Sequence, residues 1–166
     1  MKRSHKKQIR IPREEGSIDF TAGSLSTTDP SYDRDSFGKI SNIEIIPGKY
    51  LCRSIIGKDG ARIAEQIVLD DTDAIRTVDA NHSWIQIGYI TSESKTLGIF
   101  QNKPDFKAFK LIQVVKFDGD CKIWSDKTYK SEPKGFVFTL PNELAEYKVR
   151  VVKTKGRVVA IEISLV

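Results

Sequence analysis

Apolar and polar residues alternate along most of this chain, and the clearest alternation lies in its last twenty residues. Two β-rich runs, residues 147–153 and 157–166, flank a short turn at residues 154–156. Side chains two residues apart share one face of a strand, so Val149 and Val151 lie on the same face of the first run. The pattern predicts a β-hairpin with one apolar face to bury.

The same pattern occurs once before, in residues 50–56 followed by residues 60–69. A one-residue slip in the turn brings the second runs of the two copies into correspondence. The corresponding pairs are Tyr50 and Tyr147, Cys52 and Val149, Arg53 and Arg150, Ile63 and Val159, Ala64 and Ala160, Ile67 and Ile163, and Leu69 and Leu165. We therefore expect two related β units, at about residues 17–73 and 83–166.

Residues 61–69 also fit a second interpretation. Ile63 and Ile67 are four residues apart and Asp59 could cap a helix, which together would suit two helical turns. As a strand, the segment points Glu65 toward the apolar face, since Glu65 lies where the second copy has Ile161. The match to the final hairpin favours the strand.

The remaining segments complete a β-rich chain. Residues 17–28 suggest one or two strands interrupted at Gly23, residues 70–73 a solvated acidic turn, and residues 83–90 the strand that opens the second unit. Residues 103–134 have no counterpart in the first unit and are interpreted as an inserted hairpin. The predicted fold is all-β, a sandwich or partly open barrel built from two repeated β units with an inserted hairpin.

Composition narrows the class of protein. At 166 residues, with 39% hydrophobic and 30% charged residues, the chain suits one globular domain with its own core. It has no apolar run long enough to span a membrane, and the N-terminus carries charges where a signal peptide needs an apolar segment. We therefore expect a cytoplasmic protein without a membrane partner.

The net charge of +5 is concentrated at the N-terminus. Residues 1–15 hold six basic residues against Glu14 and Glu15, a balance of +4, so the rest of the chain carries only +1. We interpret residues 1–16 as a basic, flexible arm that either binds nucleic-acid phosphates or serves as a solvated tail. Its candidate binding residues are Lys2, Arg3, Lys6, Lys7, Arg10 and Arg13.

Metal and cofactor sites are not indicated. Cys52 and Cys121 lie in β-like runs without an export signal, which favours two free thiols over a disulfide. The acidic loop at residues 29–38 departs from the EF-hand pattern, because Phe37 stands where an oxygen ligand is needed. We expect a capped, solvated loop, no metal and no cofactor.

No catalytic constellation emerges either. His82 is the one histidine outside the arm, and no nucleophile motif accompanies it. An enzyme would need a concave pocket in which acidic loop residues converge with a tyrosine or a histidine. The residues available for such a pocket are Asp29, Asp33, Asp35, Tyr32 and His82.

Two groups of residues are candidates for binding. Arg53 and Arg150 occupy equivalent places in the two copies, so they suit a paired site for an anion or a phosphopeptide. The alternative is a pair of solvent-facing arginines that discourage edge-to-edge pairing. Aromatic and basic residues of the insertion suit a partner-binding platform, unless core packing explains the aromatic ones. The second group is Lys107, Phe109, Lys110, Lys122 and Trp124.

Several short motifs resemble those of a protein family. They are Asp29-Pro30-Ser31-Tyr32, Gly98-Ile99-Phe100 and the closing Gly156-Arg-Val-Val-Ala-Ile-Glu-Ile. The chain resembles, over residues 18–166, a family of small uncharacterised β proteins of bacteria and phages. Its motifs are Asp-Pro-Cys-Tyr, Gly-Ile-Phe-Asp and a C-terminal Gly-x-Val-Val-Ala-x-x-Ile strand. Ser31 and Gln101 stand where the family favours cysteine and aspartate. The resemblance implies the fold and a bacterial or phage origin, hence a host cytoplasm if phage-encoded.

These patterns favour a non-catalytic binding protein. We expect a macromolecular partner, most simply another protein, held by loops and the inserted hairpin. Nucleic-acid binding through the arm is the first alternative, and an enzyme with a carboxylate-based site is the second. A homodimer is compatible with two related β units.

Overall fold

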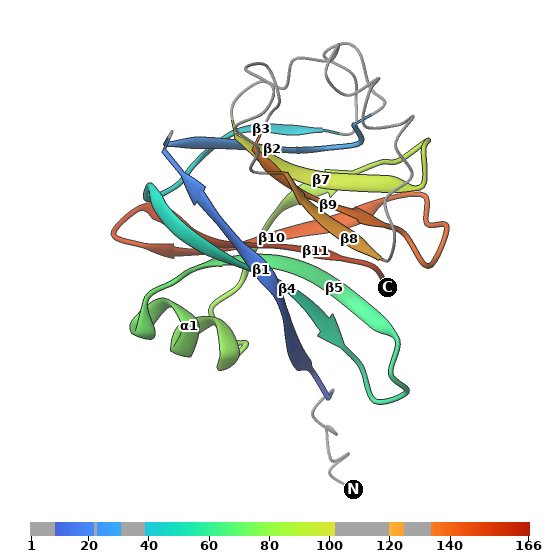
Figure 1. Cartoon of the computed structure of the whole chain (residues 1–166), viewed down its shortest axis with the longest axis horizontal. Helices are drawn as coiled ribbons and strands as arrows, with labels where there is room; N and C mark the ends of the chain where they lie inside the picture. Colours follow the sequence, from blue (N-terminus) through green and yellow to red (C-terminus); the bar gives the residue numbers. More distant parts are fainter. Residues whose placement is uncertain (1–8, 22, 31–38, 102–119, 125–133) are drawn as a thin grey trace, which may run out of the picture.

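The computed structural model describes residues 9–21, 23–30, 39–101, 120–124 and 134–166. In this part of the chain, eleven strands form two antiparallel sheets, and one helix lies outside the larger sheet (Figure 1). The strands are β1 (Ile11–Phe20), β2 (Ser24–Thr28), β3 (Ile40–Glu44), β4 (Gly48–Ile56), β5 (Arg62–Leu69), β6 (Ile85–Ile90), β7 (Thr96–Gln101), β8 (Cys121–Trp124), β9 (Gly135–Thr139), β10 (Tyr147–Thr154) and β11 (Arg157–Ser164). The helix is α1 (Thr72–Asp79). No helix within the described ranges is long and apolar enough to cross a membrane.

The two sheets form a sandwich, which confirms the predicted all-β class. The larger sheet has the order β1-β4-β5-β11-β10-β6, and the smaller has the order β3-β2-β7-β9-β8. Apolar side chains from both sheets meet between the layers. This core includes Ile18, Phe20, Leu25, Tyr50, Cys52, Ile67, Ile90, Phe136, Phe138, Tyr147, Val149 and Ile163.

The strand order has the symmetry that two repeated units require. Strands β1 to β5 correspond in turn to β6, β7, β9, β10 and β11, so both sheets are arranged about a pseudo-twofold axis. The axis passes between β5 and β11 in the larger sheet and between β2 and β7 in the smaller one. Strand β8 alone has no counterpart, and it belongs to the segment that was predicted to be an insertion.

The repeat extends to details of the predicted hairpins. Both hairpins form, and each contains a β-bulge, at Ile63 between β4 and β5 and at Val159 between β10 and β11. The two residues correspond in the sequence alignment of the copies. Tyr50 and Tyr147 also behave alike, since each buries its ring and donates its hydroxyl to a backbone carbonyl at 2.7 and 2.8 Å.

A second pair of bulges lies at the two edges of the larger sheet. Pairing of β1 with β4 is irregular just before Gly16, and pairing of β6 with β10 is irregular just before Gly88. Both glycines have a positive φ, 148° and 154°, which L residues rarely adopt. An isoleucine side chain lies against each glycine, Ile123 at Gly16 and Ile40 at Gly88. The two edges are therefore built in the same way.

Residues 61–69, whose sequence fitted both a helix and a strand, contain strand β5. All of its residues are buried apart from the last, Leu69, which is half-buried. It lies next to β11 in the middle of the larger sheet, with both neighbours hydrogen-bonded to it. The repeat therefore predicted this strand where local periodicity did not.

Helix α1 corrects the expectation of a simple acidic turn at residues 70–73. Asp71 caps the helix by accepting a hydrogen bond from the backbone nitrogen of Ala74 at 3.1 Å. The helix buries Ala74 and Val78 against the outer face of the larger sheet. The sheet residues that receive it are Val68, Val152, Val159 and Ala160. The acidic run thus includes a helix start as well as a turn.

The expected arm at residues 1–16 also needs correction, because β1 begins at Ile11. Residues 11–16 are hydrogen-bonded to β4 from its far end, although their side chains are largely exposed. A strand held by backbone pairing needs few apolar side chains, so composition alone made it resemble a tail. Of the six arm candidates, Arg10 and Arg13 lie in described residues, and Lys2, Arg3, Lys6 and Lys7 lie outside them.

Gly16→Ala is expected to lower the free energy of unfolding by about 1–3 kcal/mol. The added methyl group would collide with Ile123, and the backbone at Gly16 has an unfavourable φ for alanine. Thermal denaturation would measure the loss. Gly23→Ala is the matched control, because the nearest atom to its added Cβ is 3.8 Å away. Equal melting temperatures for the two variants would contradict the prediction.

Candidate functional site

A row of polar side chains crosses the face of the larger sheet that points away from the smaller sheet. Strand register places one residue from each strand side by side in this row. From β1 to β6 the residues are Glu14, Arg53, Gln66, Glu162, Arg150 and Gln86. The pseudo-twofold axis relates the two halves of the row. Arg53 lies next to Gln66 in one half, and Arg150 lies next to Glu162 in the other. We call these six residues the polar row.

Glu162 lies at the centre of the polar row and is only 1% exposed. Its Oε2 accepts hydrogen bonds from Nε of Arg150, at 3.0 Å, and from Nη2 of the same guanidinium. Its Oε1 accepts from Nη2 of Arg10 and, at 3.1 Å, from the amide of Gln66. A buried carboxylate thus has a guanidinium on each oxygen, which offsets the cost of removing it from water.

Arg53 occupies the equivalent place in the first unit and is 6% exposed. Its Nε donates to Oε1 of Gln66 at 2.8 Å, and its Nη2 donates to the same oxygen and to Oδ1 of Asp79 at 2.8 Å. Asp79 is the last residue of α1, so the helix that the sequence did not reveal supplies the counter-charge. Arg53 and Arg150 lie in equivalent positions of the two units, as the alignment of the copies predicted, and the paired anion site stays a prediction.

The alternative interpretation of these two arginines is wrong. Solvent-facing arginines that discourage edge pairing belong on edge strands, whereas β4 and β10 each lie between two other strands. Arg53 is buried, and Arg150 is half-buried beneath the ring of Trp84, with its Cζ 5.0 Å from the ring centroid. Both guanidiniums therefore belong to an ordered network.

Besides the change from Glu14 to Gln86 within the row, its two halves differ at a second position close to the arginines. In the second unit Trp84 lies two residues before Gln86 and covers Arg150. In the first unit Pro12 lies two residues before Glu14, and its small ring leaves space beside Arg53. This space is a hollow of about 200 Å³. Its lining residues are Arg10, Pro12, Arg53, Ile55, Gln66, Val78, Asp79 and Asn81.

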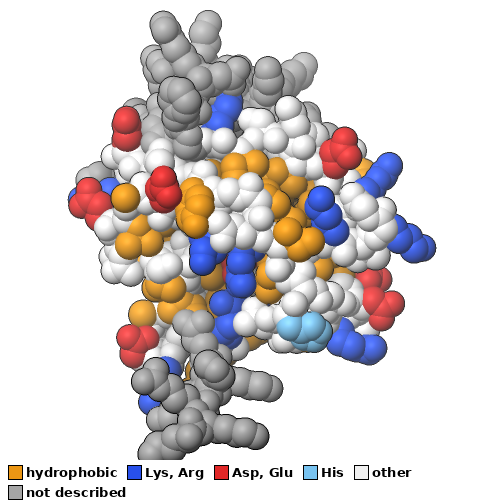
Figure 2. Space-filling view, turned by 180° about the vertical axis from the view of Figure 1, so that it is seen from behind, with side chains coloured by type: hydrophobic (Ala, Val, Ile, Leu, Met, Phe, Trp, Pro, Cys, Tyr) orange, Lys and Arg blue, Asp and Glu red, His pale blue; other side chains and the backbone are white. Residues whose placement is uncertain are grey.

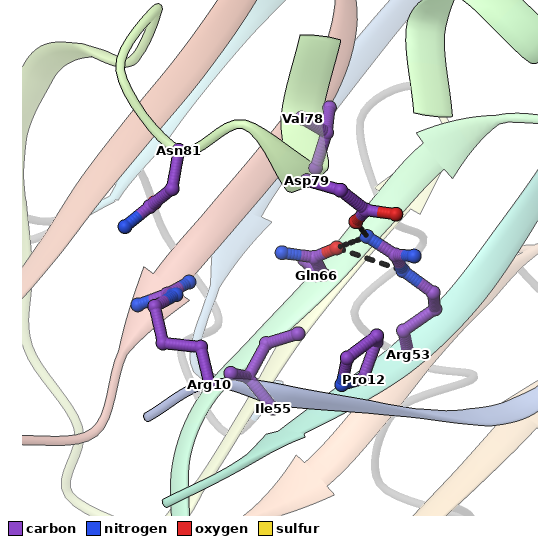
Figure 3. A pocket seen from close by; sticks show the side chains of 8 residues that line it. All are labelled: Arg10, Pro12, Arg53, Ile55, Gln66, Val78, Asp79 and Asn81. Atoms are coloured by element: carbon purple, nitrogen blue, oxygen red, sulfur yellow. Dashed lines mark hydrogen bonds and ion pairs between the residues drawn. The ribbon is translucent and has the colours of Figure 1, made fainter. Parts of the chain in front are cut away.

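Figure 3 shows how these residues surround the hollow: Arg10 and Asn81 lie on one side, Arg53 and Asp79 lie on the other, and Gln66 lies between them. Figure 2 shows the molecule from behind, with basic side chains gathered in a column between hydrophobic ones and an acidic side chain among them. The network around the hollow holds three guanidiniums, from Arg10, Arg53 and Arg150, against the carboxylates of Asp79 and Glu162. Glu14, which the register places beside Arg53, adds a third carboxylate at the edge of the row, so the charges of the whole network balance.

Several donors of the hollow have no partner in the described part of the chain. Arg53 engages its partners through Nε and Nη2, which leaves Nη1. Arg10 engages Glu162 through Nη2, which leaves Nε and Nη1. The Asn81 amide is exposed at the mouth, held by a backbone with φ of 57° directly after the helix. The hollow thus offers guanidinium and amide hydrogen-bond donors to a small acceptor group.

A second polar group lies on the inner face of the larger sheet, around Glu65. As the strand interpretation predicted, Glu65 points to the apolar side, and it is completely buried. It accepts hydrogen bonds from Oγ of Ser54, at 2.7 Å, and from Nη1 of Arg62, at 2.8 Å. Arg62 also donates to the carbonyl oxygen of Thr139 at 2.9 Å, which ties β5 to β9. Burial raises the pKa of Glu65 to about 7, although Ser54 and Arg62 oppose the shift.

Asp29, the first residue of the Asp-Pro-Ser-Tyr motif, has a structural role. It is fully buried and accepts hydrogen bonds from the backbone nitrogens of Glu93 and Ser94, at 2.7 and 2.8 Å, and from both hydroxyls of Ser92 and Ser94. These bonds fix the turn between β6 and β7. Pro30 is also buried. Asp29 is therefore committed to the fold and is not exposed in a pocket.

Of the remaining residues of the enzyme alternative, His82 is the one in the described ranges. His82 is exposed after α1, and its Nδ1 lies 3.2 Å from the carbonyl oxygen of Ala80. Tyr32, Asp33 and Asp35 lie outside the described residues. In the described ranges, no three His, Cys, Asp or Glu side chains are grouped so that they could hold a metal ion.

The inserted hairpin is described only at one strand. Lys122 is exposed on β8, and Trp124 ends that strand at the register position opposite Gly135. Lys107, Phe109 and Lys110 lie outside the described residues. The predicted platform of basic and aromatic side chains therefore stays a prediction.

The two cysteines are free thiols, as predicted. Cys52 lies fully buried in the core between the sheets, and Cys121 packs against the same core from β8. Burial raises the pKa of Cys52 strongly and that of Cys121 to about 12. Both thiols are therefore protonated and unreactive near neutral pH.

The Gly98-Ile99-Phe100 motif has a packing explanation. Ile99 points into the core, and the ring of Phe100 lies over Gly98 of the same strand and over Gly135 of the neighbouring strand β9. A Cβ at Gly135 would lie 2.9 Å from Cε1 of Phe100, so the ring needs glycine there. This motif therefore contributes to the fold of the smaller sheet.

Comparisons with known proteins add no further assignment. No protein-family model, no curated protein and no solved structure matches this chain. The resemblance suggested by the short motifs therefore stays a prediction. The function has to be argued from the geometry of the polar row and its hollow.

Glu162→Gln is expected to lower the free energy of unfolding by about 3 kcal/mol. The change leaves the guanidiniums of Arg10 and Arg150 facing each other without a counter-charge inside the sheet. Chemical denaturation would measure the loss. Glu146→Gln provides the control, because Glu146 is exposed. A Glu162→Gln protein as stable as the control would show that the carboxylate does not hold this network.

Glu65 makes stability depend on pH. Its pKa of about 7 in the folded protein exceeds the ordinary value of 4.5, so the folded state holds the proton more tightly than the unfolded state does. The free energy of unfolding should therefore fall by up to about 3 kcal/mol as the pH rises from about 5 to about 8. Denaturation of the wild type and of Glu65→Gln across this range isolates the effect. Identical pH profiles would exclude it.

Proposed function

We propose that this chain is a non-catalytic binding protein whose partner is another protein. In this proposal the hollow beside Arg53 receives an acidic side chain of that partner. The observation that carries the proposal is the set of uncommitted donors around the hollow. Arg10, Arg53 and Asn81 contribute them from three different segments that the fold brings together.

The ordering of these donors supports binding. Arg53 is fixed by Gln66 and Asp79, and Arg10 is fixed by Glu162, so neither guanidinium has to lose side-chain freedom when a ligand arrives. Asp79 is partly exposed at the rim and neutralises Arg53 only from one side. A carboxylate that enters the hollow would meet Nη1 of Arg53 and the free side of Arg10.

The size and lining of the hollow favour one acidic side chain over a whole small molecule. About 200 Å³ is less than the 300–1,000 Å³ typical of pockets for drug-sized ligands. Pro12, Ile55 and Val78 supply apolar walls that suit the methylene groups of an aspartate or a glutamate. The rest of the partner would extend over the surrounding surface, including the loops and the inserted hairpin.

The other readings of the sequence have less support. For nucleic acid, Arg13 is paired with Glu15, and Lys2, Arg3, Lys6 and Lys7 lie outside the described residues. For catalysis, Asp29 is committed to a structural turn. The resemblance to bacterial and phage proteins supports a bacterial or phage origin and suggests no activity.

The hollow can be tested by NMR titration of the full chain with acetate and with inorganic phosphate. We expect chemical-shift changes at Arg53 and Asn81 with a dissociation constant of about 1–10 mM, as is usual for a single small anion. Asn81→Asp should weaken binding at least fivefold, because it places a negative charge at the mouth while keeping the side-chain shape. Asn42→Asp is the matched control, since Asn42 is also exposed and has the same φ of 57°. Equal affinities of the two variants would contradict the proposal.

The class of partner needs a separate measurement. Fluorescence anisotropy with single- and double-stranded oligonucleotides should show no binding by the full chain at about 150 mM salt. A truncation should remove only residues 1–8, because a deletion to residue 15 would cut into β1. Salt-sensitive binding that disappears with residues 1–8 would replace the protein partner with nucleic acid.

A further inference from the structure

We propose that Gln66 determines the charge of the ligand that the hollow accepts, because it places a neutral amide where the second unit has a carboxylate. Gln66 lines the hollow and is only 1% exposed. Its counterpart in the second unit is Glu162, which lies beside it where β5 meets β11. This role of Gln66 rests on the proposed function, since it concerns which group the same hollow binds.

The two arginines of the polar row meet their cross-strand neighbours in the same way. Arg150 donates from Nε and Nη2 to Oε2 of Glu162, with 3.0 Å between Nε and that oxygen. Arg53 donates from Nε and Nη2 to Oε1 of Gln66, with 2.8 Å between Nε and that oxygen. The hydrogen-bond geometry is therefore repeated in the two units, while the charge of the acceptor is not.

This difference changes where each guanidinium is compensated. Glu162 is buried, so little water screens its attraction for Arg150. Two described carboxylates lie beside Arg53, that of Asp79, which is 47% exposed, and that of Glu14, which is also exposed. Water and salt weaken the attraction of an exposed carboxylate. Arg53 therefore keeps more attraction for an acidic ligand than a buried carboxylate at position 66 would leave.

The neighbours of Gln66 fix its amide in one orientation. A guanidinium only donates hydrogen bonds, and an ionised carboxylate only accepts them. Gln66 accordingly turns Oε1 toward Arg53 and donates from Nε2 to Oε1 of Glu162 at 3.1 Å. Since Oε1 of Gln66 occupies Nε and Nη2 of Arg53, the amide positions this guanidinium and leaves Nη1 for a ligand.

A carboxylate at position 66 would act against an anion in two ways. It would add a negative charge to the lining of the hollow, next to Arg53. It would also lie against the carboxylate of Glu162, whose Oε1 is 3.1 Å from the amide nitrogen that Gln66 now presents. Two carboxylates this close repel each other in a buried site. The amide avoids both effects, and so the first unit stays open to an acidic group.

NMR titration of full-length variants with acetate, near neutral pH and at constant ionic strength, tests this role. We expect Gln66→Glu to weaken acetate binding at least tenfold, because the new carboxylate would compensate Arg53 in place of the ligand. Gln66→Met is uncharged and of similar size, so it should weaken binding much less. Equal weakening by Gln66→Glu and Gln66→Met would show that hydrogen bonding by the amide, and not its charge, governs binding, which would overturn the proposal.

Gln86→Glu is the matched control for the added charge. Gln86 is exposed in the same polar row and does not line the hollow. It lies three strand spacings from Gln66, about 14 Å, which exceeds the screening length at physiological salt. This variant should bind acetate as the wild type does. Equal effects of Gln66→Glu and Gln86→Glu would overturn the role of Gln66 alone, whereas a wild type that binds no acetate would overturn the proposed function and this role with it.

Asp79→Asn examines the same balance of charge without a change inside the sheet. Asp79 lies at the rim, and asparagine keeps an oxygen that can accept the hydrogen bond from Arg53. Because the substitution removes a counter-charge of Arg53, acetate should bind about threefold more tightly or better. An unchanged affinity would show that the charge around Arg53 does not control the ligand, and it would equally overturn the proposal.

Discussion

A carboxylate buried in the middle of a sheet is the constraint on which this structure depends. Glu162 is shielded from water, so its charge is tolerated only while guanidiniums hold both of its oxygens. One of them, Arg150, comes from the neighbouring strand. The other, Arg10, comes from a point 152 residues earlier in the chain. The ion pair between Arg10 and Glu162 therefore compensates the buried carboxylate. It also fixes the segment that precedes β1, which forms one wall of the hollow.

The pseudo-twofold axis explains how the polar row arises, and departures from it explain the hollow. Gln66 and Glu162 are counterparts in the two copies and lie side by side where β5 meets β11. Two copies of one hairpin thus bring their arginines and acceptors into a single line. Asymmetry enters where Asp79 faces Arg53 and where Trp84 covers Arg150. Pro12 cannot fill the space that Trp84 fills in the other half, so only one arginine has room for a ligand beside it.

The repeat made much of the fold predictable from sequence. It identified β5 as a strand in spite of its helical spacing, and it placed Arg53 and Arg150 in equivalent positions. Their partners could not be predicted, because the contact of β5 with β11 depends on how distant strands are ordered. The correspondence of Gln66 with Glu162 was nevertheless visible in the alignment of the copies. Helix α1 has eight residues and two buried side chains, too weak a pattern to recognise, and β1 is held largely by its backbone.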